Sequence, residues 1–199
     1  LTVNRLSALT ALFIALLGVS SIVWATSGLR AFSSESIRQL NAREFQPVPN
    51  WGNIAPVLKA GQEVTIVTFM YAQCKSICSI ASAQFQRLSS AIQTRQLQGK
   101  VRLLSISFDP DRDTPEALSK HAQNLNVDPA IWQFVALPSH GQEMKLLKEM
   151  GVVVIPLPNG EFEHNAAFYV VNKSLQWVDL TRVDEPELAL QSALKWVEQ

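Results

Sequence analysis

The two cysteines of the chain, Cys74 and Cys78, lie four residues apart, where an apolar run changes into a helical pattern. The run before them, residues 64–70, is rich in β-branched and aromatic residues, which is typical of a buried strand. After them, apolar residues recur at the spacing of one helix face. These residues are Ile77, Ala81, Phe85, Leu88 and Ile92. The pattern predicts a strand, a turn that carries the cysteines, and a helix.

The position of the cysteine pair also indicates chemistry. If the helix has begun by Cys74, both sulfurs lie on one face, because residues i and i+4 are neighbours. The N–H groups and the dipole at a helix N-terminus favour a thiolate over a thiol, and Lys75 acts in the same direction. Two close thiolates either bind a soft metal or close a disulfide. The remaining alternative is a pair of buried cysteines that serve only packing.

An N-terminal stretch, residues 6–25, contains no charged residue and follows a short tail, residues 1–5. At ~1.5 Å per residue, a helix of this length spans ~30 Å, the hydrocarbon core of a bilayer. We expect a transmembrane anchor. The alternative is a cleaved signal peptide that ends at Val23-Trp24-Ala25. Residues 26–50 are polar and mixed, which indicates a tether, so the folded domain is expected to span residues 51–199.

Alternating elements predict an α/β domain. Further strand patterns occur at residues 101–108, 131–137, 152–155, 167–171 and 175–180, and further helical patterns at about 114–126, 142–150 and 184–199. Asn159-Gly160 is a strong hairpin signal. This order favours one mainly parallel sheet with a terminal hairpin. Positive and negative side chains balance at 17 each, so the charge gives no indication of nucleic-acid binding.

Residues 109–116 are rich in charge and join a predicted strand to a predicted helix. Asp113 and Glu116 fit a capping box, and alternatively Thr114 caps the helix with Pro115 at its first position. We interpret the aspartates and the arginine of this segment as solvated charges at a capped helix start. Ligand binding by this cluster is the less favoured alternative.

One of the three histidines is a candidate ligand. His121 lies among polar neighbours in a predicted helix and His140 in a predicted loop, so both are expected at the surface. His164 immediately precedes a buried strand, near a strand end, where α/β folds gather functional residues. Thiolates and imidazole both suit copper. Two cysteines and one histidine also fall short of the four ligands of a structural zinc site.

Three segments carry a family resemblance. They are Phe69-Met70-Tyr71-x-x-Cys74-x-x-x-Cys78, residues 107–116 (SFDPDRDTPE), and His164 followed by Ala166-Ala167-Phe168-Tyr169-Val170. Together with the N-terminal apolar segment, they resemble the SCO1/SenC family over residues 64 to the C-terminus. Lys75 and Ser79 replace prolines that are usual in the family, and Glu163 and Asn165 flank the histidine in place of Asp and Ser. The chain is therefore identified as a divergent member.

The resemblance implies a membrane-anchored, thioredoxin-like protein of cytochrome c oxidase assembly. It implies copper bound by Cys74, Cys78 and His164, expected as Cu(I) with Cu(II) as an additional state, and a metallochaperone role for the CuA centre. The implied partner is the copper-centre subunit of the oxidase or another copper-protein client. The alternative function is a thiol–disulfide oxidoreductase that reduces client cysteines, with Cys74 and Cys78 as its redox-active pair.

Either function is expected on the periplasmic, extracytoplasmic side of a membrane. A carrier that delivers copper to an oxidase centre outside the cytoplasm has to work on that side. Disulfides also form and persist there. The chain has no cysteine other than Cys74 and Cys78 with which either could mispair.

Overall fold

The computed structural model describes residues 63–74, 77–136 and 140–198. All of them belong to one compact unit, residues 47–199. The predicted tail, the predicted membrane helix at residues 6–25, the tether at 26–50 and the start of the domain at 51–62 lie outside the described residues. Within the described residues, no helix is both long and apolar enough to cross a bilayer.

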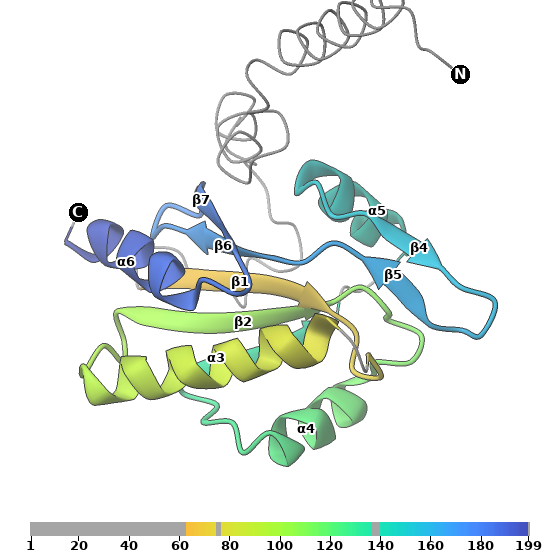
Figure 1. Ribbon diagram of the computed structural model, residues 1–199, viewed down its shortest axis with the longest axis horizontal. Coiled ribbons are helices and arrows are strands. Elements are labelled where there is room, and N and C mark those ends of the chain that lie inside the picture. The colour runs from red at the N-terminus through yellow and green to blue at the C-terminus, as the bar shows by residue number, and fades with distance from the viewer. Residues whose placement is uncertain (1–62, 75–76, 137–139, 199) are drawn as a thin grey trace, which may run out of the picture. The chain divides into compact units, whose positions relative to one another are not determined.

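A five-stranded sheet forms the centre of the domain, in the order β3-β2-β1-β6-β7 (Figure 1). Its strands are β1 (Val64–Met70), β2 (Val101–Ser107), β3 (Trp132–Ala136), β6 (Ala167–Val171) and β7 (Trp177–Arg182). The first three run parallel, whereas β6 is antiparallel to β1 and β7 to β6. The sheet is therefore mixed, and the predicted terminal hairpin forms its antiparallel part.

The central strands are apolar because they are covered on both faces. Every residue of β1 and β2 is buried, which explains their nearly continuous hydrophobic runs. On one face, a single core joins the sheet to α3 (Ile77–Thr94) and α6 (Pro186–Val197). Within this core the Phe85 ring contacts those of Trp132 and Phe168. The predicted helix face of Ala81, Phe85, Leu88 and Ile92 is buried throughout.

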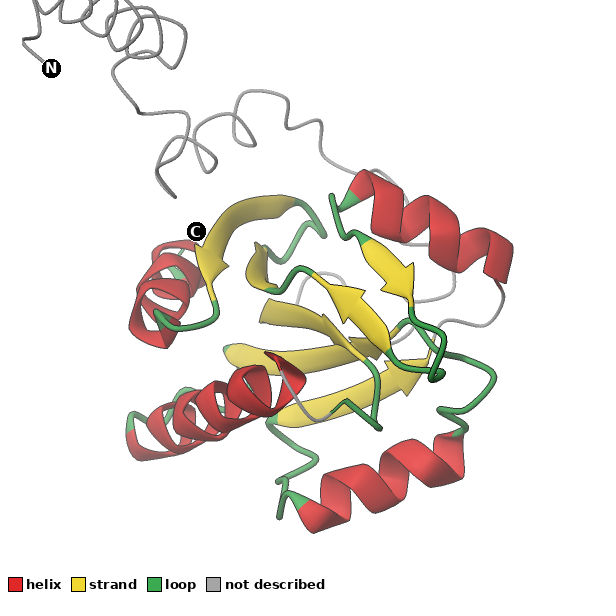
Figure 2. Ribbon diagram, turned by 45° about the vertical axis from the view of Figure 1, so that its right-hand side comes forward, coloured by secondary structure: helices red, strands yellow, loops and turns green. Residues whose placement is uncertain are grey.

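Two further helices and a small hairpin complete the described fold. The helix α4 (Pro115–Asn124) packs against the edge strand β3. A two-stranded antiparallel sheet, β4 (Val154–Pro156) and β5 (Phe162–His164), lies beside α5 (His140–Glu149) in both views (Figures 1 and 2). The predicted turn lies between these strands, and Gly160 adopts a φ of 79°, which glycine accommodates without strain.

The strands and helices predicted within the described residues are confirmed, with boundaries that shift by a few residues. One local expectation is wrong: His140 was expected in a loop, but it is the first residue of α5. The helix starts earlier than its apolar pattern indicates, because a first turn needs no apolar residue.

Candidate metal centre

The cysteine pair lies where the C-terminal end of β1 turns into α3. The helix begins at Ile77, so Cys74 precedes it, and the condition that both cysteines share a helix face is not met. Instead, the backbone N–H of Cys78 donates to the Sγ atom of Cys74 over 3.4 Å. One sulfur thus accepts a hydrogen bond from the helix N-terminus, where N–H groups without helical partners favour a thiolate. Both thiols are free of any disulfide.

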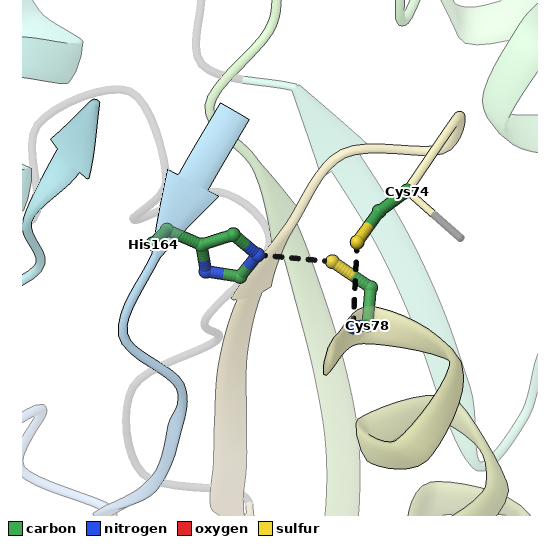
Figure 3. A group of neighbouring side chains, drawn as sticks. All are labelled: Cys74, Cys78 and His164. Atoms are coloured by element: carbon green, nitrogen blue, oxygen red, sulfur yellow. Dashed lines mark hydrogen bonds between the residues drawn. The ribbon is translucent and has the colours of Figure 1, made fainter. Parts of the chain in front are cut away.

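His164 reaches the cysteines from the other sheet. It is the last residue of β5, and its Nε2 atom lies 3.1 Å from the Sγ atom of Cys78 (Figure 3). The two sulfurs and one imidazole nitrogen all lie within 4.8 Å of one another. Metal–sulfur and metal–nitrogen bonds of about 2.3 and 2.0 Å, as zinc forms, make that spacing close to what one ion spans. The structure therefore brings together all three residues that the sequence singled out.

The orientation of the imidazole is set by its second nitrogen. The Nδ1 atom of His164 lies 2.9 Å from the backbone carbonyl oxygen of Asn165. A carbonyl only accepts, so Nδ1 carries the proton and Nε2 of the neutral ring keeps a lone pair that faces the cysteines. Asn165 is itself held, because its side chain accepts from the Val153 N–H over 2.8 Å and donates to the Gly151 carbonyl over 2.9 Å.

The two cysteines differ in exposure and in acidity. Cys74 keeps 9 % of its surface exposed and Cys78 keeps 4 %. Hydrogen bonding to Cys74, together with burial, raises the pKa of the Cys78 thiol far above its ordinary value. Cys78 therefore holds its proton at neutral pH in the metal-free protein, and a bound cation would have to displace that proton.

Aromatic rings enclose the histidine side of the centre. The Phe108 ring packs edge-on against His164 at 4.9 Å between centroids, and the Tyr71 ring lies at 6.2 Å. Phe162 contacts both Tyr71 and Phe108. Burial raises the pKa of Tyr71, so its hydroxyl stays neutral. These rings limit the contact of His164 with water on one side and leave it half-buried.

The charged segment after β2 supports the cysteine turn, a role that the sequence reasoning missed. Thr114 caps α4 with Pro115 at its first position, so of the two capping alternatives this one is confirmed. Asp113 is 1 % exposed, and one carboxylate oxygen accepts from the Ser107 hydroxyl over 2.5 Å and from the Ala72 N–H over 2.9 Å.

The expectation of solvated charges in this segment is thus wrong for two aspartates. Asp113 is buried and accepts from two donors, and Asp109 is only 6 % exposed and pairs with Arg112. The bond from the Ala72 N–H to Asp113 joins residues 41 positions apart, which a local charge pattern does not reveal.

Among the described side chains, His121 is not part of the donor group. His121, expected at the surface, is half-buried. Its ring packs edge-on against Phe134, and its buried Nε2 atom finds no hydrogen-bond partner within the described residues. Burial lowers the pKa of His121 accordingly. The side chain of His140 is not among those that the structure describes.

Comparison with known proteins gives consistent matches. The family model described as SCO1/SenC matches residues 42–199. A protein of Bacillus subtilis (strain 168) described as a SCO1 protein homolog is 27 % identical over 111 residues, which cover 55 % of this chain and 56 % of that protein. The match thus spans little more than half the length of this curated relative.

Solved structures share the fold. BsSco, a member of the Sco family of cytochrome c oxidase assembly proteins in which a disulfide switch was identified, superposes with a TM-score of 0.58 at 23 % identity, covering 68 % of this chain and 81 % of that one. ScoI of Bradyrhizobium japonicum, solved with copper bound, gives 0.57 at 21 % identity, covering 69 % and 86 %. At these identities the likeness shows a common mixed α/β, thioredoxin-like fold.

Proposed function

The chain belongs to the SCO1/SenC family, and from that premise we propose that it is a copper metallochaperone whose ion is held by Cys74, Cys78 and His164. The observation that carries the proposal is the convergence of two sulfurs and one imidazole nitrogen within 4.8 Å. Thiolates are the soft ligands that Cu(I) prefers, and imidazole accommodates both Cu(I) and Cu(II). A three-donor set leaves room for a ligand of the receiving protein.

The cargo is expected to be exchanged from the side of Cys74 and His164. His164 is half-buried and Cys74 is more exposed than Cys78, so an incoming ligand meets those two first. Cys78 lies deepest and would release copper last, recovering its proton as the ion leaves. The Asn165 carbonyl holds the proton on Nδ1 of His164 throughout, so Nε2 can release and rebind an ion without a change of tautomer.

The client we propose is the copper-centre subunit of cytochrome c oxidase, with the CuA centre as the destination. Support comes from family membership and from BsSco, whose family is one of cytochrome c oxidase assembly proteins. Another copper protein with an exposed thiol or imidazole pair would meet the same chemical requirement.

The cellular arrangement we propose has residues 6–25 as a membrane helix, 26–50 as a tether and 51–199 as the copper-binding domain on the extracytoplasmic side. The uncharged stretch of twenty residues supports it. A flexible tether of this length has a typical reach of ~25–30 Å, enough to move the site along the membrane surface. Fusion of the C-terminus to a reporter that is active only outside the cytoplasm tests the arrangement, and a silent fusion of a stably made protein would contradict it.

A second function, reduction of client disulfides, is favoured by two adjacent thiols that form no disulfide with each other. The more exposed Cys74 would attack a client disulfide and form a mixed disulfide. Cys78 would then give up its proton, displace the second client sulfur and close the Cys74–Cys78 disulfide. Two electrons and two protons pass to the client, which leaves as a dithiol.

Copper titration of the reduced protein under anaerobic conditions tests the first function. Wild type should bind one equivalent, and the double variant Cys74→Ala/Cys78→Ala should lose that binding. Equal binding by the double variant would refute the proposal. The variant His164→Ala separates the two functions, because copper transfer requires the imidazole and thiol exchange does not. Loss of both copper binding and oxidase assembly supports transfer, and intact assembly without copper binding supports disulfide reduction.

A further inference from the structure

Arg112 links the two halves of the candidate centre. It lies in the turn after β2, where the N–H groups of Arg112 and Asp113 both donate to the Asp109 carbonyl. Its guanidinium pairs with the Asp109 carboxylate and donates through Nη1 to the Gly160 carbonyl over 2.6 Å. Gly160 belongs to the turn between β4 and β5, the hairpin that ends in His164.

The same guanidinium lies over two aromatic rings. Its central carbon is 5.1 Å from the centroid of Phe162 and 5.7 Å from that of Tyr71, distances at which a cation is attracted to a ring face. Phe162 begins β5, whereas Tyr71 follows β1 and leads to Cys74. The Phe162 N–H also donates to the Tyr71 hydroxyl over 3.3 Å. Arg112 therefore covers the junction between the cysteine segment and the histidine hairpin.

We propose that Arg112 is a positioning residue that holds the β4–β5 hairpin against the cysteine turn and so sets the place of the His164 imidazole. The inference rests on the proposed metal site and adds a residue that touches no ligand atom. β4 and β5 form a sheet separate from the central one, so no strand pairing fixes the hairpin to β1 within the described residues. The contacts of Arg112 and the Tyr71–Phe162 hydrogen bond supply polar attachment, beside the ring contacts of Phe108 and Tyr71 with the hairpin.

The neighbouring residue has the complementary task, which strengthens the inference. Asp113 binds the Ala72 N–H and thereby fixes the cysteine side, while Arg112 binds the hairpin. Two consecutive side chains of one turn thus hold the two halves of the centre. A purely structural alternative is that Arg112 only neutralises the buried Asp109 carboxylate. That alternative predicts no specific effect on the hairpin or on the histidine.

The first test follows hydrogen exchange in the metal-free full-length protein. Arg112→Met keeps an apolar chain over the rings and removes the charged donor. Exchange of the backbone N–H groups of β5 should accelerate by about tenfold, the size expected for losing a hydrogen bond to a charged group. Arg95→Met is the matched control, since Arg95 is an exposed arginine paired with Glu187. Unchanged exchange in β5, or equal acceleration across the central sheet, would overturn the proposal.

The second test is a double-mutant cycle on Cu(I) affinity, measured by competition with a chelator. Arg112→Met should weaken binding by about tenfold, as is typical for residues that orient a metal ligand. In the His164→Ala background the same substitution should change affinity by less than about twofold, because Arg112 acts through the histidine. An equal loss in both backgrounds would refute positioning.

Two further outcomes stay informative. If Arg112→Met does not fold, Arg112→Lys decides by the same readouts, since lysine keeps the charge beside Asp109 but lacks the planar fork. If His164→Ala binds copper as tightly as wild type, the proposed ligand set fails, while the exchange of β5 still decides whether Arg112 holds the hairpin.

Discussion

Replacing Asp113 is expected to destabilise the protein more than replacing any other charged residue in the turn after β2. Asp113→Ala leaves the buried Ser107 hydroxyl and the part-buried Ala72 N–H without their acceptor. A buried unsatisfied donor costs about 1–3 kcal/mol. Because the Ser107 hydroxyl can rotate towards another acceptor, we expect a loss of about 2–4 kcal/mol in the free energy of unfolding. That is a large part of the roughly 5–15 kcal/mol of a typical domain.

Urea unfolding followed by circular dichroism measures this loss. Asp113→Asn keeps one carbonyl oxygen that can accept from both donors, so it should lose less than half as much as Asp113→Ala. Asp111→Ala removes an exposed aspartate of the same turn and should stay within about 0.5 kcal/mol of wild type. A loss below about 1 kcal/mol for Asp113→Ala would refute the role assigned to the carboxylate. Equal losses for the alanine and asparagine variants would show that charge, rather than acceptor geometry, matters.

Three further predictions concern the hairpin and α4. Asn165→Ala removes the bonds that fix the carbonyl behind His164, so Cu(I) affinity in a chelator competition should fall by about tenfold, and wild-type affinity would contradict this. Gly160→Ala places a residue with a side chain at a φ of 79°, so the midpoint temperature of thermal unfolding should fall by about 2–4 °C. An unchanged midpoint would contradict the positive φ of that turn. Burial lowers the pKa of His121, so the unfolded state binds its proton more readily. Stability should therefore fall as pH drops below about 6.5, and His121→Leu should remove that part of the pH dependence, as urea unfolding across pH 5–7.5 will show.

Much of the candidate site was predictable because its evidence is local. The apolar run of β1 and the spaced apolar face of α3 identify the strand-to-helix turn that carries Cys74 and Cys78. His164 was identified by its place before β6, and it belongs to the donor group that the structure shows. Local patterns of this kind depend on residues a few positions apart, which a sequence displays directly.

What the sequence did not reveal depends on contacts between distant segments. The local charge pattern predicts a solvated Asp113 because its partner Ala72 lies 41 residues away. It predicts a solvated Arg112 because its partner Gly160 lies 48 residues away. His121 was misplaced because polar neighbours in the helix do not show that its ring packs on Phe134. Asn165, noted only as a departure from the family pattern, holds the carbonyl that orients His164.

The most direct test of the account is X-ray absorption at the copper edge of the reduced protein loaded with one equivalent of Cu(I). The account predicts two sulfur ligands from Cys74 and Cys78 and one imidazole nitrogen from His164, with the nitrogen lost in His164→Ala. A copper environment with fewer than two sulfurs, or one that His164→Ala leaves unchanged, would contradict it.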